Sequence, residues 1–76
     1  MYFSTVTISS IAKARAFVEM TAKYPNIRIM LSCRDYSVDA HSIIGILSLD
    51  LAQPIQLEAE GEHIDDLISD LQPYTV

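Results

Sequence analysis

Apolar and polar positions along the chain follow two periods, which together predict four strands and three helices. Strands are expected over residues 2–8, where β-branched and aromatic residues are mixed with threonines, over 27–32 and 55–60, where apolar residues alternate with polar ones, and over the short segment 36–38. Helices are expected over residues 11–23 and 62–72, where apolar residues recur three or four positions apart, and over the short apolar segment 42–49. The order β-α-β-β-α-β-α implies an α+β fold. It would be an open-faced β-sandwich, in which three helices cover one side of a four-stranded antiparallel sheet.

Proline and glycine mark the ends of the predicted helices. Pro25 follows the first helix, Gly61 precedes the last one and Pro73 follows it. The apolar stripes expected to face the sheet are Ala14, Phe17, Val18 and Thr21 in the first helix and Ile64, Leu67, Ile68 and Leu71 in the last. Arg34-Asp35 is the expected turn between the second and third strands, although neither glycine nor asparagine marks it.

Length and composition limit the function classes. Seventy-six residues, half of them hydrophobic, are expected to form one domain, residues 1–76, with no membrane span and no secretory signal. The single cysteine, Cys33, excludes an internal disulfide, fits a reducing cytoplasm and is expected to be a passive side chain. Ten acidic residues against five dispersed basic ones give a net charge of −5, which argues against direct binding of nucleic acid.

The stretch DAHSIIGILSL, residues 39–49, contains a short helix that is apolar on nearly every side. A helix of about two turns buries only one side, and the spacing predicts that Ile46 and Leu49 point inward. The residues left on an exposed rim would be Ile43, Ile44 and Leu47. Such a rim indicates a recognition site for a partner. The alternatives are that the helix packs more deeply than the spacing suggests or that the rim closes a homodimer.

The order of elements, with SIIGILSL at residues 42–49 and AEGE at 59–62, resembles HPr, the histidine-containing phosphocarrier family of the bacterial sugar phosphotransferase system. HPr proteins typically carry a Lys-Ser-Ile-Met-Gly-Leu-Met-Ser-Leu-like segment, which residues 41–49 match nearly residue for residue. The resemblance covers almost the whole chain and is most specific from Val38 onward. It implies the HPr fold and a protein that is not an enzyme and needs no cofactor.

The phosphocarrier loop of the family does not carry over. HPr passes phosphate through a histidine at the start of its first helix, in a pattern resembling Ile-His-Ala-Arg-Pro-Ala, where residues 11–16 here read IAKARA. Alignment on Arg15 places Lys13 at the histidine, and alignment on later helix residues places Ser10 there. A protonated lysine cannot replace a neutral imidazole as nucleophile. The resemblance therefore predicts a degenerate phosphocarrier loop, which comprises Ser10, Ala12, Lys13 and Arg15.

Ser42 corresponds to the second functional residue of the family. In many Gram-positive HPr proteins the serine at this place is phosphorylated by a dedicated HPr kinase/phosphorylase, and the phosphoserine form pairs with a regulator of carbon catabolite repression. An N-cap position suits a phosphate, because helix-end amides and the positive end of the helix dipole face it. The alternative is that Ser42 only caps the helix. His41 replaces the usual lysine, which would weaken recognition by a kinase or partner.

Two other groups of polar residues have the composition of a catalytic or metal site but are better explained as ordinary surface residues. Asp39, His41 and Ser42 are the residue types of a hydrolase triad, but they lie too close in sequence to converge as a triad does. A second group, which could offer metal ligands on one face of the last helix, consists of His63, Asp66 and Asp70. An exposed acidic face accounts for that group, so no metal site is predicted.

Three functions remain open, and the first is preferred. It is a non-catalytic regulator of the phosphotransferase and carbon-catabolite system, phosphorylated at Ser42. Its protein partners would be a kinase resembling HPr kinase/phosphorylase, a catabolite-control regulator or phosphotransferase components, and they would dock on His41, Ile43, Ile44 and Leu47. The second is an HPr-fold interaction module or homodimer in which Ser42 is buried or capped. The third is phosphotransfer through a displaced histidine, His41 or His63, beside an anion-binding helix end and a base such as Arg15.

Overall fold

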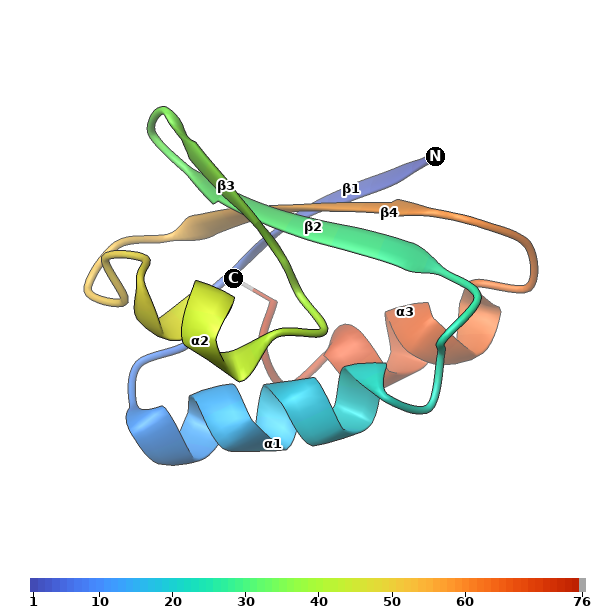
Figure 1. Ribbon diagram of the computed structural model, residues 1–76. Coiled ribbons are helices and arrows are strands. Elements are labelled where there is room, and N and C mark those ends of the chain that lie inside the picture. The colour runs from blue at the N-terminus through green and yellow to red at the C-terminus, as the bar shows by residue number, and fades with distance from the viewer. Residues whose placement is uncertain (76) are drawn as a thin grey trace.

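The computed structural model describes residues 1–75, and its elements follow the predicted order (Figure 1). The strands are β1 (Tyr2–Val6), β2 (Arg28–Cys33), β3 (Tyr36–Asp39) and β4 (Ile55–Glu60). The helices are α1 (Ile11–Thr21), α2 (Ile43–Leu47) and α3 (Asp65–Leu71). Within the described residues no helix is long and apolar enough to cross a membrane.

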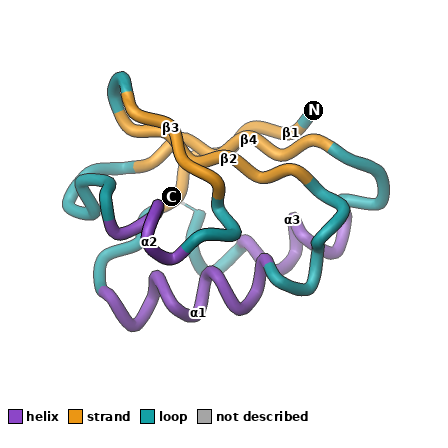
Figure 2. The backbone as a smooth tube through the Cα atoms, in the orientation of Figure 1, coloured by secondary structure: helices purple, strands orange, loops and turns teal. Residues whose placement is uncertain are grey.

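The four strands form one antiparallel sheet in the order β1-β4-β2-β3 (Figure 2). β4 comes last in sequence but lies between β1 and β2, so that Leu57 is paired with Ser4 on one side and Leu31 on the other. All three helices lie on one side of the sheet and leave its other side open (Figure 1). The predicted open-faced β-sandwich is confirmed.

The core lies between the sheet and the helices, and β4 shows how the sequence builds it. Its alternate residues Ile55, Leu57 and Ala59 are buried, while the residues between them are exposed. Successive side chains of a strand point to opposite faces, so this pattern assigns one apolar face to the helices. Ile29 and Leu31 continue the same buried face on β2.

The helices meet this face with the stripes that the sequence predicts. The buried stripe residues are Ala14, Phe17 and Thr21 in α1 and Leu67 and Leu71 in α3. The remaining stripe residues, Val18, Ile64 and Ile68, are half-buried at the margins. The rings of Phe17 and Tyr74 meet edge to face with their centroids 5.0 Å apart, so the C-terminal segment closes the core beside α1.

Two connecting segments contain residues with positive φ angles. Arg34 has φ 58°, which supplies the left-handed conformation that a tight hairpin needs, so the predicted turn forms without glycine or asparagine. Gly61 and His63 have φ 158° and 58°. A helix requires φ near −60°, so the expected start of the last helix at Glu62 is wrong and α3 begins only at Asp65.

The other elements differ from the prediction only at their ends. β1 ends at residue 6 rather than 8, α1 at 21 rather than 23, and α2 spans 43–47 rather than 42–49. Ile8 and Leu49 are nevertheless buried, at 0% and 6% exposure. At these two positions the apolar pattern identifies a buried side chain correctly but overestimates how far the regular backbone extends.

Candidate functional site

Ser42 lies at the entrance to α2 and caps this helix. Its backbone is extended, with φ −111° and ψ 115°, and the Gly45 amide donates a hydrogen bond of 3.2 Å to Ser42 Oγ. The Ser42 side chain is exposed at the same time. The hydroxyl therefore caps the helix and is also accessible from solvent. The cap bond is compatible with both roles considered for Ser42, a phosphorylation site and a residue that only caps the helix.

α2 buries one side and exposes the other. Ile46 is completely buried and Leu49 nearly so, as the spacing predicts. On the opposite side, Ile44 is 80% and Leu47 42% exposed. Ile43 is half-buried and packs against the core, so it is less exposed than the rim position predicted for it. Ile43, Ile44 and Leu47 are called the α2 patch below.

α1 lies beside the α2 patch. Ile43 lines a shallow groove of about 190 Å³ together with Arg15, Val18 and Glu19 of α1. One turn before Arg15, Ile11 is 63% exposed on the same side of α1. A basic side chain and a further apolar one therefore accompany the α2 patch at the surface.

The residues that the sequence predicts as a degenerate phosphocarrier loop lie at the start of α1. Ser10 is the N-cap, and its Oγ accepts a hydrogen bond of 3.1 Å from the Lys13 amide. The side chains of Ala12, Lys13 and Arg15 are exposed. The two histidines of the chain, His41 and His63, are both outside this helix.

The side chains of Asp39, His41 and Ser42 do not form a hydrolase triad. Asp39 Oδ1 accepts a hydrogen bond of 2.8 Å from the backbone amide of His41 rather than from its ring. The ring Nε2 of His41 lies 3.1 Å from the carbonyl oxygen of Ile27, and Ser42 Oγ accepts from Gly45. Each of the three side chains thus makes a separate structural hydrogen bond.

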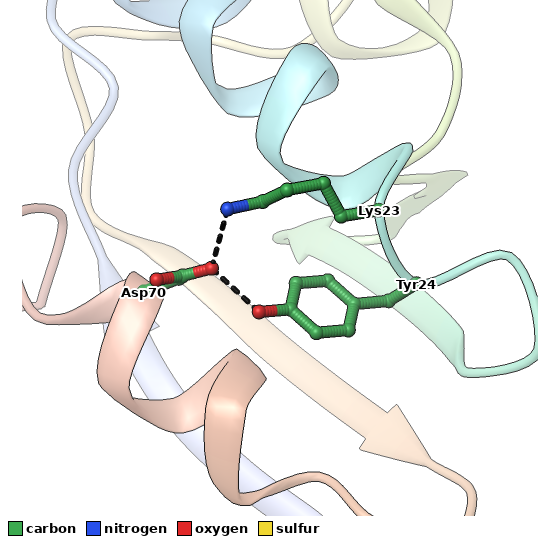
Figure 3. A network of polar contacts seen from close by, with 3 residues as sticks. All are labelled: Lys23, Tyr24 and Asp70. Atoms are coloured by element: carbon green, nitrogen blue, oxygen red, sulfur yellow. Dashed lines mark hydrogen bonds and ion pairs between the residues drawn. The ribbon is translucent and has the colours of Figure 1, made fainter.

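Asp70 belongs to a polar network that joins α3 to the end of α1 (Figure 3). Its Oδ2 lies 2.8 Å from Lys23 Nζ and accepts a 2.5 Å hydrogen bond from the Tyr24 hydroxyl. Hydrogen bonds from Lys23 and then Tyr24 hold the pKa of Asp70 below its ordinary value of 3.8. The bond to Asp70, with a smaller contribution from burial, raises the pKa of Tyr24 to about 12.

Contrary to what the spacing of the three residues predicts, His63 does not lie on one helix face with Asp66 and Asp70. His63 lies before α3 in a left-handed conformation, and Asp70 is engaged by Lys23 and Tyr24. Among residues 1–75, no three His, Cys, Asp or Glu side chains are grouped so as to hold a metal ion.

Sequence patterns did not single out two features of the structure. A surface pocket of about 530 Å³ opens between the loop after α1 and the loop before α3, and Lys23, Tyr24, Glu62 and His63 are among its lining residues. The other feature is the hydrogen bond that the hydroxyl of the completely buried Thr21 donates to the carbonyl of Ala40. Both depend on contacts between distant segments, for which a single sequence carries no local signal.

Comparisons with known proteins agree with the fold. A family model described as the PTS HPr component phosphorylation site matches residues 10–75. The structure is similar to HPr-C-His from Thermoanaerobacter tengcongensis, with 29% identity, a TM-score of 0.81, and coverage of 96% of this chain and 89% of that one. It is also similar to a phosphocarrier protein HPr from Bacillus anthracis str. Ames, with 25% identity, a TM-score of 0.72 and coverage of 99% and 96%. A comparison with curated proteins finds no match.

Proposed function

Since the chain belongs to the HPr family of the phosphotransferase system, we propose that it is a non-catalytic regulatory member, phosphorylated at Ser42 and not on a histidine. Proteins of this family interact with other proteins of the phosphotransferase system. The proposed partners are a kinase of the HPr kinase/phosphorylase type and a catabolite-control regulator or phosphotransferase component, which would dock on the α2 patch.

The first turn of α1 supports the loss of histidine phosphotransfer. The positions that align with the family histidine are Ser10, whose Oγ caps the helix, and Lys13, whose amide donates to that cap. Neither side chain offers a neutral nitrogen nucleophile at neutral pH. The relocated acceptors considered above, His41 and His63, both lie outside α1, where the family carries its histidine.

The observation that carries the proposal is the accessible Ser42 hydroxyl beside Ile44, which is 80% exposed. A phosphate on Ser42 would add nearly two negative charges at the edge of an apolar surface. Full burial of one large exposed apolar side chain gains about 1.5–3 kcal/mol of transfer free energy, from which the costs of association are subtracted. Ile44 and Leu47 therefore offer a partner a small apolar anchor whose surroundings change with phosphorylation.

A second function is favoured by the cap bond itself. The Gly45 amide already binds Ser42 Oγ, which is the arrangement expected of a serine that serves only the helix. In that case the protein is an HPr-fold interaction module, and the α2 patch binds a partner or a second copy without phosphorylation.

Intact-mass spectrometry after incubation with HPr kinase/phosphorylase and ATP tests the proposal. Ser42→Ala is the test variant. The matched control is Ser48→Ala, because Ser48 is an exposed serine at the other end of α2 whose hydroxyl donates to the Gly45 carbonyl. The proposal expects one phosphate on the parent chain and on Ser48→Ala, and none on Ser42→Ala. An unmodified parent chain would favour the bare interaction module.

A further inference from the structure

The turn that carries Ser42 is fixed by hydrogen bonds along its length. The Ala40 amide donates to the Ile29 carbonyl at 2.9 Å, which ties the start of the turn to β2. The Ser42 amide donates to the Asp39 carbonyl at 3.1 Å, and the His41 amide to Asp39 Oδ1 at 2.8 Å. The backbone before α2 is therefore held in one conformation rather than left as a free loop.

The Ala40 end of this turn is anchored inside the protein. Thr21 is completely buried, and its Oγ1 lies 3.2 Å from the Ala40 carbonyl and 2.9 Å from the Val18 carbonyl. Ala40 itself is completely buried. Hydrogen bonds in such a dry site are costly to break, because an unpaired group would remain without water. This end of the turn stays in place whatever happens at the surface.

The Ser42 end has a different anchor, which lies near the surface. The half-buried His41 ring places Nε2 3.1 Å from the Ile27 carbonyl oxygen, on the segment that leads into β2. A carbonyl oxygen only accepts, so Nε2 must carry the proton of this bond. Among the described residues, no other side-chain hydrogen bond joins His41 or Ser42 to an element outside the turn and α2.

We propose that His41 is a positioning residue for Ser42. Its bond to Ile27 sets the direction in which Ser42 Oγ and the α2 patch are presented to a kinase or partner. The inference rests on the proposed phosphorylation of Ser42. Because Thr21 and Ile29 hold the turn at Ala40, loss of the His41 bond loosens the presentation of Ser42 without unfolding the sheet or α1.

Two substitutions separate the hydrogen bond from the bulk of the ring. In His41→Gln the side-chain amide nitrogen lies at nearly the reach of Nε2 and can donate to Ile27, whereas His41→Leu fills similar space without a donor. His63→Asn is the control, because it removes the other histidine and asparagine tolerates the left-handed backbone found there.

The rate of Ser42 phosphorylation, as kcat and KM with HPr kinase/phosphorylase, is the first measurement. Loss of one ordinary hydrogen bond corresponds to about a two- to tenfold fall in kcat/KM for His41→Leu. His41→Gln and His63→Asn should stay within about twofold of the parent chain on the same scale. Equal kcat/KM values for His41→Leu and the parent chain would overturn the positioning role. Equal losses of kcat/KM in His41→Leu and His41→Gln would overturn it as well.

Hydrogen exchange of the Gly45 amide is the second measurement, and it needs no kinase. This amide is bound to Ser42 Oγ, so it reports directly whether the cap is held. We expect faster exchange in His41→Leu and restored protection in His41→Gln. If the kinase leaves the parent chain unmodified, the proposed function fails while this exchange still decides the positioning role. Unchanged Gly45 exchange in His41→Leu would refute that role independently.

Discussion

Ile44 and Ile46 are two residues apart in one short helix, but truncating them should have very different costs. Replacement of isoleucine by alanine removes roughly three methylene equivalents, worth about 0.8 kcal/mol each when buried. Ile46 is completely buried, so Ile46→Ala should lose about 2.4 kcal/mol of transfer free energy plus a cavity penalty, or about 2–5 kcal/mol in total. Ile44 is 80% exposed, so Ile44→Ala should lose about a fifth of the transfer term, roughly 0.5 kcal/mol.

Urea unfolding followed by circular dichroism measures both free energies of unfolding. A chain of this length has a total stability of roughly 4–11 kcal/mol at typical values per residue, so Ile46→Ala removes a large share of it. The two variants should differ by at least about 1.5 kcal/mol with unchanged m-values. Similar losses in both would refute the orientation of α2, and the α2 patch would then not be a docking surface.

Three further predictions concern the cap, the polar network and one turn. Ser42→Ala should cost about 1 kcal/mol through the lost cap and lower the midpoint of thermal unfolding by about 4–8 °C, whereas Ser42→Asp, which keeps a capping oxygen, should melt close to the parent chain. Because Lys23 and then Tyr24 lower the pKa of Asp70 in the folded chain, its contribution to stability is present above its ordinary pKa of 3.8 and is lost as pH falls through the folded pKa. Asp70→Ala should therefore flatten the acid side of the stability profile measured by urea unfolding. In ultraviolet titration the same variant should lower the pKa of Tyr24 from about 12 toward its ordinary 10, because the hydrogen bond to Asp70 is the largest cause of the rise. Gly61→Ala should destabilise by about 1–3 kcal/mol in chemical unfolding, since φ is 158° and a Cβ would lie 3.2 Å from Ile27 Cα.

The parts of the fold that the sequence predicts are those that depend on burying an apolar face. Ile55, Leu57 and Ala59 alternate with polar residues, and a one-residue slip of β4 would turn all three away from the core. The inward direction of Ile46 and the capping role of Ser42 follow from similarly local rules. These rules compare a residue with its close neighbours in the chain, and a single sequence contains that information.

The features that were missed depend on segments far apart in sequence. Thr21 looks like an ordinary stripe residue until its hydroxyl meets the Ala40 carbonyl, 19 residues away. The Tyr24–Asp70 bond joins residues 46 positions apart. His63 has φ 58°, a conformation that is uncommon outside glycine and that the sequence pattern did not indicate. His41 was considered for chemistry, whereas its ring is engaged with Ile27.

The central claim is that this HPr-family chain no longer passes phosphate through a histidine, and incubation with Enzyme I and phosphoenolpyruvate tests it most directly. Intact-mass spectrometry at neutral or alkaline pH preserves a phosphohistidine, and a histidine-bearing HPr serves as the positive control in a parallel tube. The account predicts a phosphate on the control protein and none on this chain. A phosphate on this chain that is lost in acid and in His41→Gln or His63→Asn would contradict it, and would place the acceptor on the histidine whose replacement abolishes it.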